Sequence, residues 1–363
     1  MAAPSRTASR TAPASPAPPA LAIPLIESAF PRQLHPYWPR LQESTRNWLL
    51  EKRLMPADKV ERYADGLLYT DLVAGYYLGA SDEVLSAISD FTAWFFAWDD
   101  RQDRDVVHGR ESAWLRLCVR LQSALESPEE YMHHRDPLVA GFADSVSRIY
   151  GWLGPIWNAR FARHFHRTID ACDQEFINRT TRTVPEPGAY LELRRLTFGH
   201  WIWTDLLELV ARCELPDEVR KHGAFRQAAL ATQDFAAWYN DLCSLPKEYA
   251  GGEIHNLGIV LIRHEGLSVE EATAEVRRRA GRCVTEFLEA ERAVLLLADE
   301  AADGTFRGAE LSAALKSCVG NMRNWFSSVY WWHHESGRYR VDSWDDPSTP
   351  PYVSDGPAAH EEG

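Results

Sequence analysis

Two groups of oxygen-bearing side chains, about 140 residues apart, are the residues of this sequence best suited to chemistry. Asp99 and Asp103 lie four positions apart, so a helix would place both carboxylates on one face. Asn240, Ser244 and Glu248 also recur at intervals of four and would stack an amide, a hydroxyl and a carboxylate in one stripe. Mg²⁺ prefers oxygen ligands and commonly binds substrate phosphates as well. Two such faces on opposite sides of a cavity would hold Mg²⁺ against a diphosphate.

Neither group alone is sufficient evidence for a metal site, because most runs of charged residues are solvated faces of surface helices. The run that includes Asp100, however, follows the strongly apolar segment 94–98. Carboxylates at the end of such a segment would lie at a partly buried rim, where an unpaired charge is costly and a metal ion is a natural partner. The second group contains poor helix formers and Pro246, which weakens the hydrogen-bond ladder of a helix. A surface helix with a Pro-kinked end is the alternative there.

Helical periodicity dominates the segments that must position these groups. In residues 81–103, Ser81 is a suitable N-cap, and apolar residues recur at helical spacing up to the Asp cluster. Residues 282–300 and 320–334 also place apolar side chains on one side, Leu295 among them. Strand-like alternation is nearly absent. We therefore predict an all-α protein, built as a helical bundle with a central cavity.

The two ends of the chain differ in composition from the middle. Residues 1–22 are rich in Pro and Ala, and such a segment buries too little apolar surface to become ordered. Residues 347–363 form an acidic, Pro-containing tail that we expect to be partly ordered. No linker divides residues 23–346, so we predict that they form a single domain.

The composition restricts the partners and the compartment. A net charge of −13 disfavours nucleic acid and anionic membrane surfaces as partners. The 6 Cys are scattered without a Cys-x-x-Cys pair, which indicates a reduced, cytoplasmic protein. There is no long apolar stretch and no signal-peptide pattern, so we expect no membrane anchor. The His pairs, such as His133-His134, do not have the spacing of a zinc site.

Four motifs, taken together, are typical of one enzyme family. The run DDRQD (99–103) matches the pattern Asp-Asp-x-x-Asp, and NDLCSLPKE (240–248) matches Asn-Asp-x-x-Ser-x-x-Lys-Glu. The segment 190–199 resembles the family's diphosphate-sensing segment, whose Arg lies 46 positions before the Asn of the second motif; here that residue is Arg194. Arg338-Tyr339 matches a late Arg-Tyr pair. Over residues 22–353 the chain resembles the class I bacterial terpene synthases, and in particular their sesquiterpene cyclases.

The resemblance implies a role for each matching residue. It implies that Asp99 binds two of three Mg²⁺ ions and that Asn240, Ser244 and Glu248 hold the third. It implies that the diphosphate is bound by Arg194, Lys247, Arg338 and Tyr339. Asp100 and Asp103 match the motif without needing to touch metal, and Asp100 is expected to pair with Arg338 when the site closes. Independent chemistry agrees, because Arg side chains bind phosphate oxygens bidentately.

A set of aromatic side chains lies one helical turn inside these motifs or on other predicted helices. A carbocation is quenched by water, so it must be stabilised by π faces, each worth ~0.5–2 kcal/mol. Ordinary core packing is the alternative for any one of these residues alone. The resemblance implies that the group lines the substrate pocket: Phe95, Phe96, Phe198, Trp203, Trp325 and Trp332.

Two positions depart from the pattern that the resemblance leads us to expect: Trp332 stands where we expect Phe, and Gly199 where we expect Ala. A helix break at Gly199 would re-aim Trp203 and expose a backbone carbonyl to the cation. This hypothesis excludes a continuous helix through Gly199.

The resemblance implies a Mg²⁺-dependent sesquiterpene cyclase that ionises farnesyl diphosphate, isomerises it and cyclises it through a bisabolyl cation to a tricyclic hydrocarbon. Another sesquiterpene product of the same chemistry is an alternative. A chain-elongating prenyltransferase would need a second Asp-rich motif in place of the Asn, Ser and Glu found here. A non-catalytic isoprenoid-diphosphate binding protein would not need the full metal set. No protein residue is placed to act as the final base, and the released diphosphate is a credible acceptor.

Overall fold

The computed structural model describes residues 20–57, 60, 68–302 and 304–339, and within them it contains helices and no strands. The first helices are α1 (Pro24–Ala29), α2 (Trp38–Glu51), α4 (Tyr69–Tyr76), α5 (Asp82–Val107), α6 (Glu111–Glu126), α7 (Pro128–Tyr131), α8 (Pro137–Tyr150) and α9 (Pro155–Thr181). They are followed by α10 (Pro187–Thr197), α11 (His200–Ala211), α12 (Asp217–Lys221), α13 (Gly223–Ala250), α14 (Leu257–Glu265), α15 (Val269–Ala301), α16 (Phe306–Glu335) and the short 3₁₀ helix η1 (Gly337–Tyr339). The predicted all-α class is confirmed.

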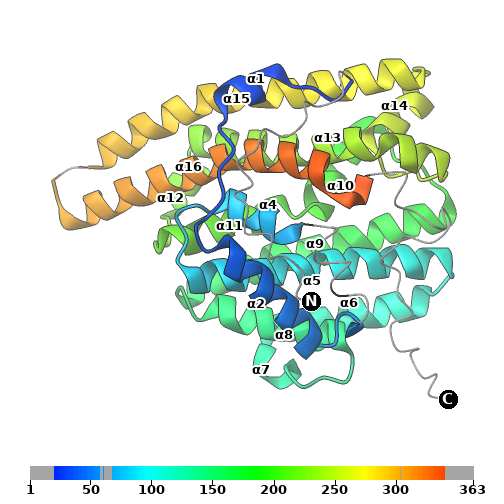
Figure 1. The fold of residues 1–363 in the computed structure, drawn as a ribbon, viewed down its shortest axis with the longest axis horizontal. Helices are drawn as coiled ribbons and strands as arrows, with labels where there is room; N and C mark the ends of the chain where they lie inside the picture. The colour runs from blue at the N-terminus through cyan, green and yellow to red at the C-terminus, as the bar shows by residue number, and fades with distance from the viewer. Residues whose placement is uncertain (1–19, 58–59, 61–67, 303, 340–363) are drawn as a thin grey trace, which may run out of the picture.

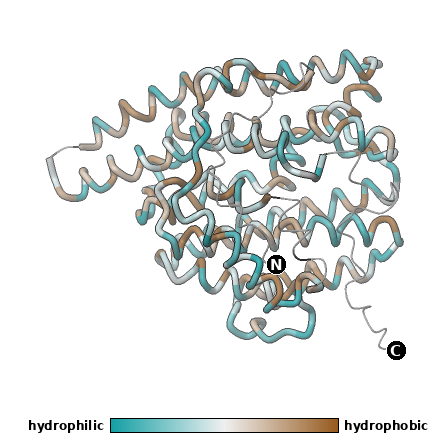
Figure 2. Tube along the Cα trace, in the orientation of Figure 1, coloured by the Kyte–Doolittle hydropathy of each residue, from teal (hydrophilic) through white to brown (hydrophobic). Residues whose placement is uncertain are grey.

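The helices form one bundle in which α13 and α16 lie inside, between α15 on one side and α5, α6 and α8 on the other (Figure 1). The C-terminal end of α15 and the N-terminal end of α16 extend together beyond the rest of the bundle as a helical hairpin (Figure 1). Hydrophobic and hydrophilic residues are interspersed along most helices (Figure 2), as expected for helices that turn one face to the core. Helix α4 differs, because all of its residues are buried. No helix in the described part of the chain is long and apolar enough to cross a membrane.

Local signals in the sequence account for several helix boundaries. The Ser81 hydroxyl accepts a hydrogen bond from the Val84 amide, so the predicted N-cap of α5 is confirmed. A capping box between Ser268 and Glu271 begins α15. In α13 the helix continues past Pro246, which lies on its exposed side, and ends at Ala250. This continuation keeps residues 240–248 on a single helix.

One prediction about a helix face was wrong. Leu295 is exposed on α15, and its neighbour Val294 is buried instead. The buried positions Ala280, Phe287 and Val294 are spaced by seven residues. At about 100° per residue, Val294 lies about 20° around the helix from Phe287 whereas Leu295 lies about 80° from it, so Val294 shares the buried face and Leu295 does not.

The predicted domain limits fall partly outside the described residues, because residues 1–19 and 340–363 are not among them. Leu21, within the segment expected to be disordered, accepts a hydrogen bond from the Tyr239 hydroxyl through its backbone carbonyl. All six cysteines are free thiols, as expected.

Candidate active site

The first metal motif (Asp99, Asp100 and Asp103) lies near the C-terminal end of α5, with all three carboxylates on one continuous helix. Arg338 of η1 donates from Nη2 to Asp99 Oδ2 at 2.8 Å and from Nη1 to Asp100 Oδ1 at 3.3 Å. The expected pair between Asp100 and Arg338 is therefore present. Many protein atoms lie around Asp99, but 47% of its side-chain surface remains exposed. The side chain of Asp100 is 6% exposed. Asp99 is thus the accessible carboxylate of this pair.

The electrostatics of the first metal motif favour a bound cation. Burial, followed by the charge of Asp103, raises the pKa of Asp99 to about 6. Burial raises the pKa of Asp100 to about 7, even though Arg338 opposes this shift. The charge of Arg338 therefore does not fully compensate the two carboxylates.

Asp103 has a different partner from the other two carboxylates. Arg179 of α9 donates from Nη1 to Asp103 at 2.7 Å and from Nη2 to Glu253 at 2.8 Å. Glu253 lies in the loop after α13, so Arg179 connects the first motif to the segment that follows the second. Sequence reasoning missed Arg179, because no short-range motif marks it. This pairing agrees with the expectation that Asp103 need not bind metal.

The second metal motif (Asn240, Ser244 and Glu248) occupies one stripe of α13, as its spacing predicted. Asn256, the N-cap of α14, donates from Nδ2 to Glu248 Oε2 at 2.9 Å and to Ser244 Oγ at 3.2 Å. Its Oδ1 accepts from the Gly258 amide at 2.8 Å. Asn256 therefore orients two of the three predicted ligands, a role that sequence reasoning missed although an Asn before an apolar run is a recognisable N-cap signal.

Burial, followed by the charge of Asp241, raises the pKa of Glu248 to about 7. Among the described residues, no three His, Cys, Asp or Glu side chains are grouped as a metal site by themselves. The donor set is instead mixed, because it combines an amide, a hydroxyl and a carboxylate on α13 with carboxylates on α5. These oxygen donors and their uncompensated charge fit Mg²⁺. Lys247 lies beside Glu248 on the exposed side of α13.

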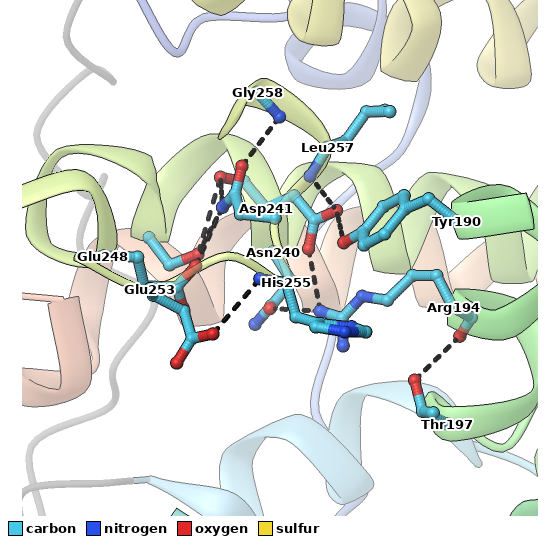
Figure 3. A network of polar contacts seen from close by, with 12 residues as sticks. Tyr190, Arg194, Thr197, Asn240, Asp241, Glu248, Glu253, His255, Leu257 and Gly258 are labelled. Carbon is cyan, nitrogen blue, oxygen red and sulfur yellow. Dashed lines mark hydrogen bonds and ion pairs between the residues drawn. The ribbon is translucent and has the colours of Figure 1, made fainter. Parts of the chain in front are cut away.

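Hydrogen bonds link Arg194 and Tyr339, two of the predicted diphosphate residues, to the second motif, and Figure 3 shows those of Arg194. Arg194 of α10 donates from Nη2 to Asn240 Oδ1 and to Asp241 Oδ1, both at 2.8 Å. Asn240 Nδ2 in turn donates to the Tyr339 hydroxyl at 2.7 Å. Asp241 is buried and also accepts from the Tyr190 hydroxyl at 2.7 Å, so it holds Arg194 and Tyr190 together. Sequence reasoning did not assign Asp241 a role, although it lies inside the motif.

The predicted pocket aromatics form separate groups in the structure. Phe95 meets Trp203 edge-on, with ring centroids 5.3 Å apart. Phe96 lies 5.7 Å from Trp332. Trp325 is buried, as Trp203 and Trp332 are, and stacks on Tyr76 with ring centroids 4.0 Å apart.

Two contacts connect the predicted aromatic residues to the polar site, and a third adds a ring to the group of Phe96. Tyr69, which sequence reasoning missed, stacks on Phe96 at 4.1 Å. The Arg338 guanidinium carbon lies 5.2 Å from the centre of the Phe96 ring, and that of Arg194 lies 5.3 Å from the Phe198 ring. Aromatic side chains are therefore adjacent to both of the arginines predicted to bind diphosphate.

The predicted helix break is present at Gly199. Helix α10 ends at Thr197, Gly199 has a φ of 77°, and α11 begins at His200. At the break, the Phe198 carbonyl accepts a hydrogen bond from Trp203 Nε1 at 2.8 Å, and the carbonyl exposed to the cation stays a prediction. The break re-aims Trp203 so that its indole N–H satisfies a carbonyl that the ended helix leaves unpaired.

These features agree with a match to a family model. Residues 90–286 match the model described as "Terpene synthase family 2, C-terminal metal binding". The chain belongs to this terpene synthase family, and it is a class I terpene synthase, a lyase that uses a divalent metal. It is 71% identical over 337 residues to the epi-isozizaene synthase of Streptomyces coelicolor, a match that covers 93% of each chain. It is 30% identical to the pentalenene synthase of Streptomyces avermitilis, over 86% of this chain and 92% of that one.

Solved structures share the fold. The linalool/nerolidol synthase of Streptomyces clavuligerus in complex with 2-fluorogeranyl diphosphate aligns with a TM-score of 0.73 at 22% identity, covering 83% of this chain and 100% of that one. The germacradien-4-ol synthase of Streptomyces citricolor aligns with a TM-score of 0.72 at 23% identity, over 84% of this chain and 96% of that one. At these identities the likeness concerns the fold.

Proposed function

We propose that the chain is a sesquiterpene cyclase that ionises farnesyl diphosphate, releases diphosphate and cyclises the remaining cation to epi-isozizaene. The identity of 71% over 93% of the chain to epi-isozizaene synthase supports this product. The observation that carries the proposal lies in η1. Arg338 bonds to Asp99 and Asp100 of the first metal motif, and Tyr339 bonds to Asn240 of the second. One short segment therefore joins both motifs, where a diphosphate between them would be enclosed.

The donor set supports the binding of three Mg²⁺ ions. Asp99 would hold two of them, and Asn240, Ser244 and Glu248 would hold the third. When bound, Mg²⁺ acts as a Lewis acid on the diphosphate leaving group. Arg194, Lys247, Arg338 and Tyr339 would donate hydrogen bonds to the diphosphate oxygens and so hold the leaving group in place.

The aromatic groups support the second half of the reaction. Phe95, Phe96, Phe198, Trp203 and Trp332 would present π faces to the cation, and together they would exclude water from it. Trp325, which stacks on Tyr76, would belong to the same aromatic set. The carboxylates described at this site either belong to the two metal motifs or, like Glu253, pair with Arg179, so the released diphosphate remains the proposed final base.

The test is to incubate the purified full chain with farnesyl diphosphate and Mg²⁺, measure released diphosphate, and analyse the volatile extract by gas chromatography–mass spectrometry. We expect one main hydrocarbon that matches authentic epi-isozizaene, formed with one diphosphate per molecule, and none in the presence of EDTA. A different sesquiterpene would overturn the product and keep the reaction class. No turnover of farnesyl, geranyl or geranylgeranyl diphosphate would overturn the function.

A further inference from the structure

The helix break between α10 and α11 is bridged by one carboxylate from a third helix. Asp234 of α13 accepts from Arg195 Nε at 2.8 Å and from Arg195 Nη2 at 2.6 Å, and Arg195 lies in the last turn of α10. Asp234 Oδ1 also bonds to Nε2 of His200, the first residue of α11, at 3.0 Å. We call these three residues the Asp234 bridge. It therefore holds both sides of the break against α13.

The Asp234 bridge is a buried and specific arrangement. The Asp234 side chain is 13% exposed and His200 is 1% exposed, so solvent does not replace these bonds easily. The bidentate geometry of Arg195 sets its orientation as well as its distance, because the planar guanidinium matches the carboxylate plane. Such an arrangement restricts the angle at which α11 leaves α10.

The residues that flank the bridge belong to the proposed active site. Arg194, directly before Arg195, bonds to Asn240 on the same helix as Asp234, six residues further on. Helix α10 is thus attached to α13 through each arginine, in addition to the bond from Tyr190 to Asp241. On the other side of the break, Trp203 contacts Phe95 and bonds to the Phe198 carbonyl. The angle between α10 and α11 at the break therefore sets where the rings of Phe198 and Trp203 lie relative to Arg194, which is proposed to bind the diphosphate.

We propose that Asp234, Arg195 and His200 are positioning residues that determine product selection by setting the position of Phe198 and Trp203. This inference rests on the proposed cyclase function. The cation at each branch of the reaction is stabilised by the ring that lies nearest to its charge. Small changes in ring position therefore alter the partition between competing cyclisations, since about 1.4 kcal/mol between two barriers changes a product ratio tenfold.

The test compares the product distributions of Asp234→Asn and Arg195→Gln with that of the unchanged chain, using farnesyl diphosphate and Mg²⁺. The distribution is a ratio among products, so it does not depend on the fraction of enzyme that is folded. Arg195 is 36% exposed, so Arg195→Gln is expected to fold even if Asp234→Asn does not. Arg195→Lys keeps a charge without the bidentate geometry and should give an intermediate distribution.

Asp144→Asn is the matched control. Asp144 of α8 is 12% exposed, against 13% for Asp234, and it likewise accepts from several donors: Trp48, Lys52 and Arg148. It is not part of the helix break. Asp144→Asn should therefore lower the thermal unfolding midpoint by a similar amount and leave the product distribution as it is.

The expected result is that the share of the main product falls by about twofold or more in Asp234→Asn and Arg195→Gln, and not in Asp144→Asn. An unchanged distribution in both bridge variants would overturn the inference, and so would an equal change in Asp144→Asn. Failure of the unchanged chain to convert farnesyl diphosphate would instead overturn the proposed function, so the two failures are distinguishable.

Discussion

Arg194 and Asn240 are hydrogen-bonded to each other, with Arg194 Nη2 at 2.8 Å from Asn240 Oδ1. The oxygen that the second metal motif would offer to Mg²⁺ is therefore held by a residue proposed to bind the diphosphate. A cation at Asn240 Oδ1 would compete with the guanidinium, because both are positively charged and seek the same oxygen. We expect the arrival of metal and the turning of Arg194 toward the diphosphate to occur together.

The role of Glu248 as a metal ligand can be tested by an isosteric change. Glu248→Gln removes the one carboxylate of the second metal motif and keeps an oxygen that can accept from Asn256. We expect diphosphate release to fall by at least about 100-fold and the Mg²⁺ concentration for half-maximal rate to rise. The measurement is diphosphate release against Mg²⁺ concentration.

Glu253→Gln is the control for that experiment, because Glu253 is a nearby carboxylate that pairs with Arg179. We expect Glu253→Gln to lower the rate of diphosphate release by less than about tenfold, because mutation of a residue that orients a metal ligand typically costs about 10- to 100-fold. Equal losses in the two variants would contradict the assignment of Glu248 as a ligand.

Asn256 has two separable roles, and two substitutions distinguish them. Asn256→Asp keeps the side-chain oxygen that caps α14 and loses the donor to Ser244 and Glu248. Asn256→Ala loses both. We expect the Mg²⁺ concentration that gives half-maximal activity to rise by about 10- to 100-fold in both variants. Only Asn256→Ala should also lose the cap, which is worth about 1 kcal/mol.

The measurements for Asn256 are Mg²⁺ titration of activity and urea unfolding of each variant. A normal Mg²⁺ requirement in Asn256→Asp would show that the hydrogen bonds from Asn256 do not orient the ligands.

Gly199→Ala should strain the helix break. A φ of 77° disfavours any side chain by about 1–2 kcal/mol, and an added Cβ would lie 3.2 Å from Trp203 Nε1. We expect a lower free energy of unfolding and a changed product mixture. Gly281→Ala is the matched control, because its Cβ would meet nothing within 4 Å inside α15. That change should stabilise the protein by up to about 1 kcal/mol. If Gly199→Ala were as stable as Gly281→Ala, the strain argument would fail.

His255 should make the protein less stable in acid. Burial lowers the pKa of His255 to about 4, so the folded protein holds this ring neutral, while the unfolded chain protonates it near pH 6.5. Because the unfolded state binds more protons, this contribution to stability is complete above pH 6.5 and is lost as the pH falls toward 4. At pH 4.5 the loss is worth about 2–3 kcal/mol.

The measurement for His255 is the free energy of urea unfolding at pH 7 and at pH 4.5, with His255→Gln as the comparison. Gln keeps a group that can accept the hydrogen bond from Asn178 and cannot titrate. We expect the loss between the two pH values to be smaller in the variant by about 2–3 kcal/mol. Equal losses in both proteins would show that His255 does not contribute to acid sensitivity.

Local chemistry made the helical class and the two ligand stripes predictable. The spacing of Asn240, Ser244 and Glu248 decides which helix face they share, because this depends only on the geometry of one helix. The N-cap at Ser81 and the break at Gly199 were predictable for the same reason: each depends on the few residues around it. The motif residues could therefore be chosen before any contact between helices was known.

Helix packing determines which partners these residues meet. Arg179 and Asp234 show no motif, and Asn256 shows only an N-cap signal. They matter because helix packing brings them to Asp103, to both sides of the break, and to Glu248. Trp325, which looked like the other aromatics in sequence, stacks on Tyr76 only because α16 packs against α4. Contacts between distant residues depend on how whole helices pack, and the periodicity of one helix does not contain that information. Local residue patterns thus specify the chemistry available to this protein, and the packing of its helices sets how that chemistry is oriented, because packing depends on contacts between distant residues.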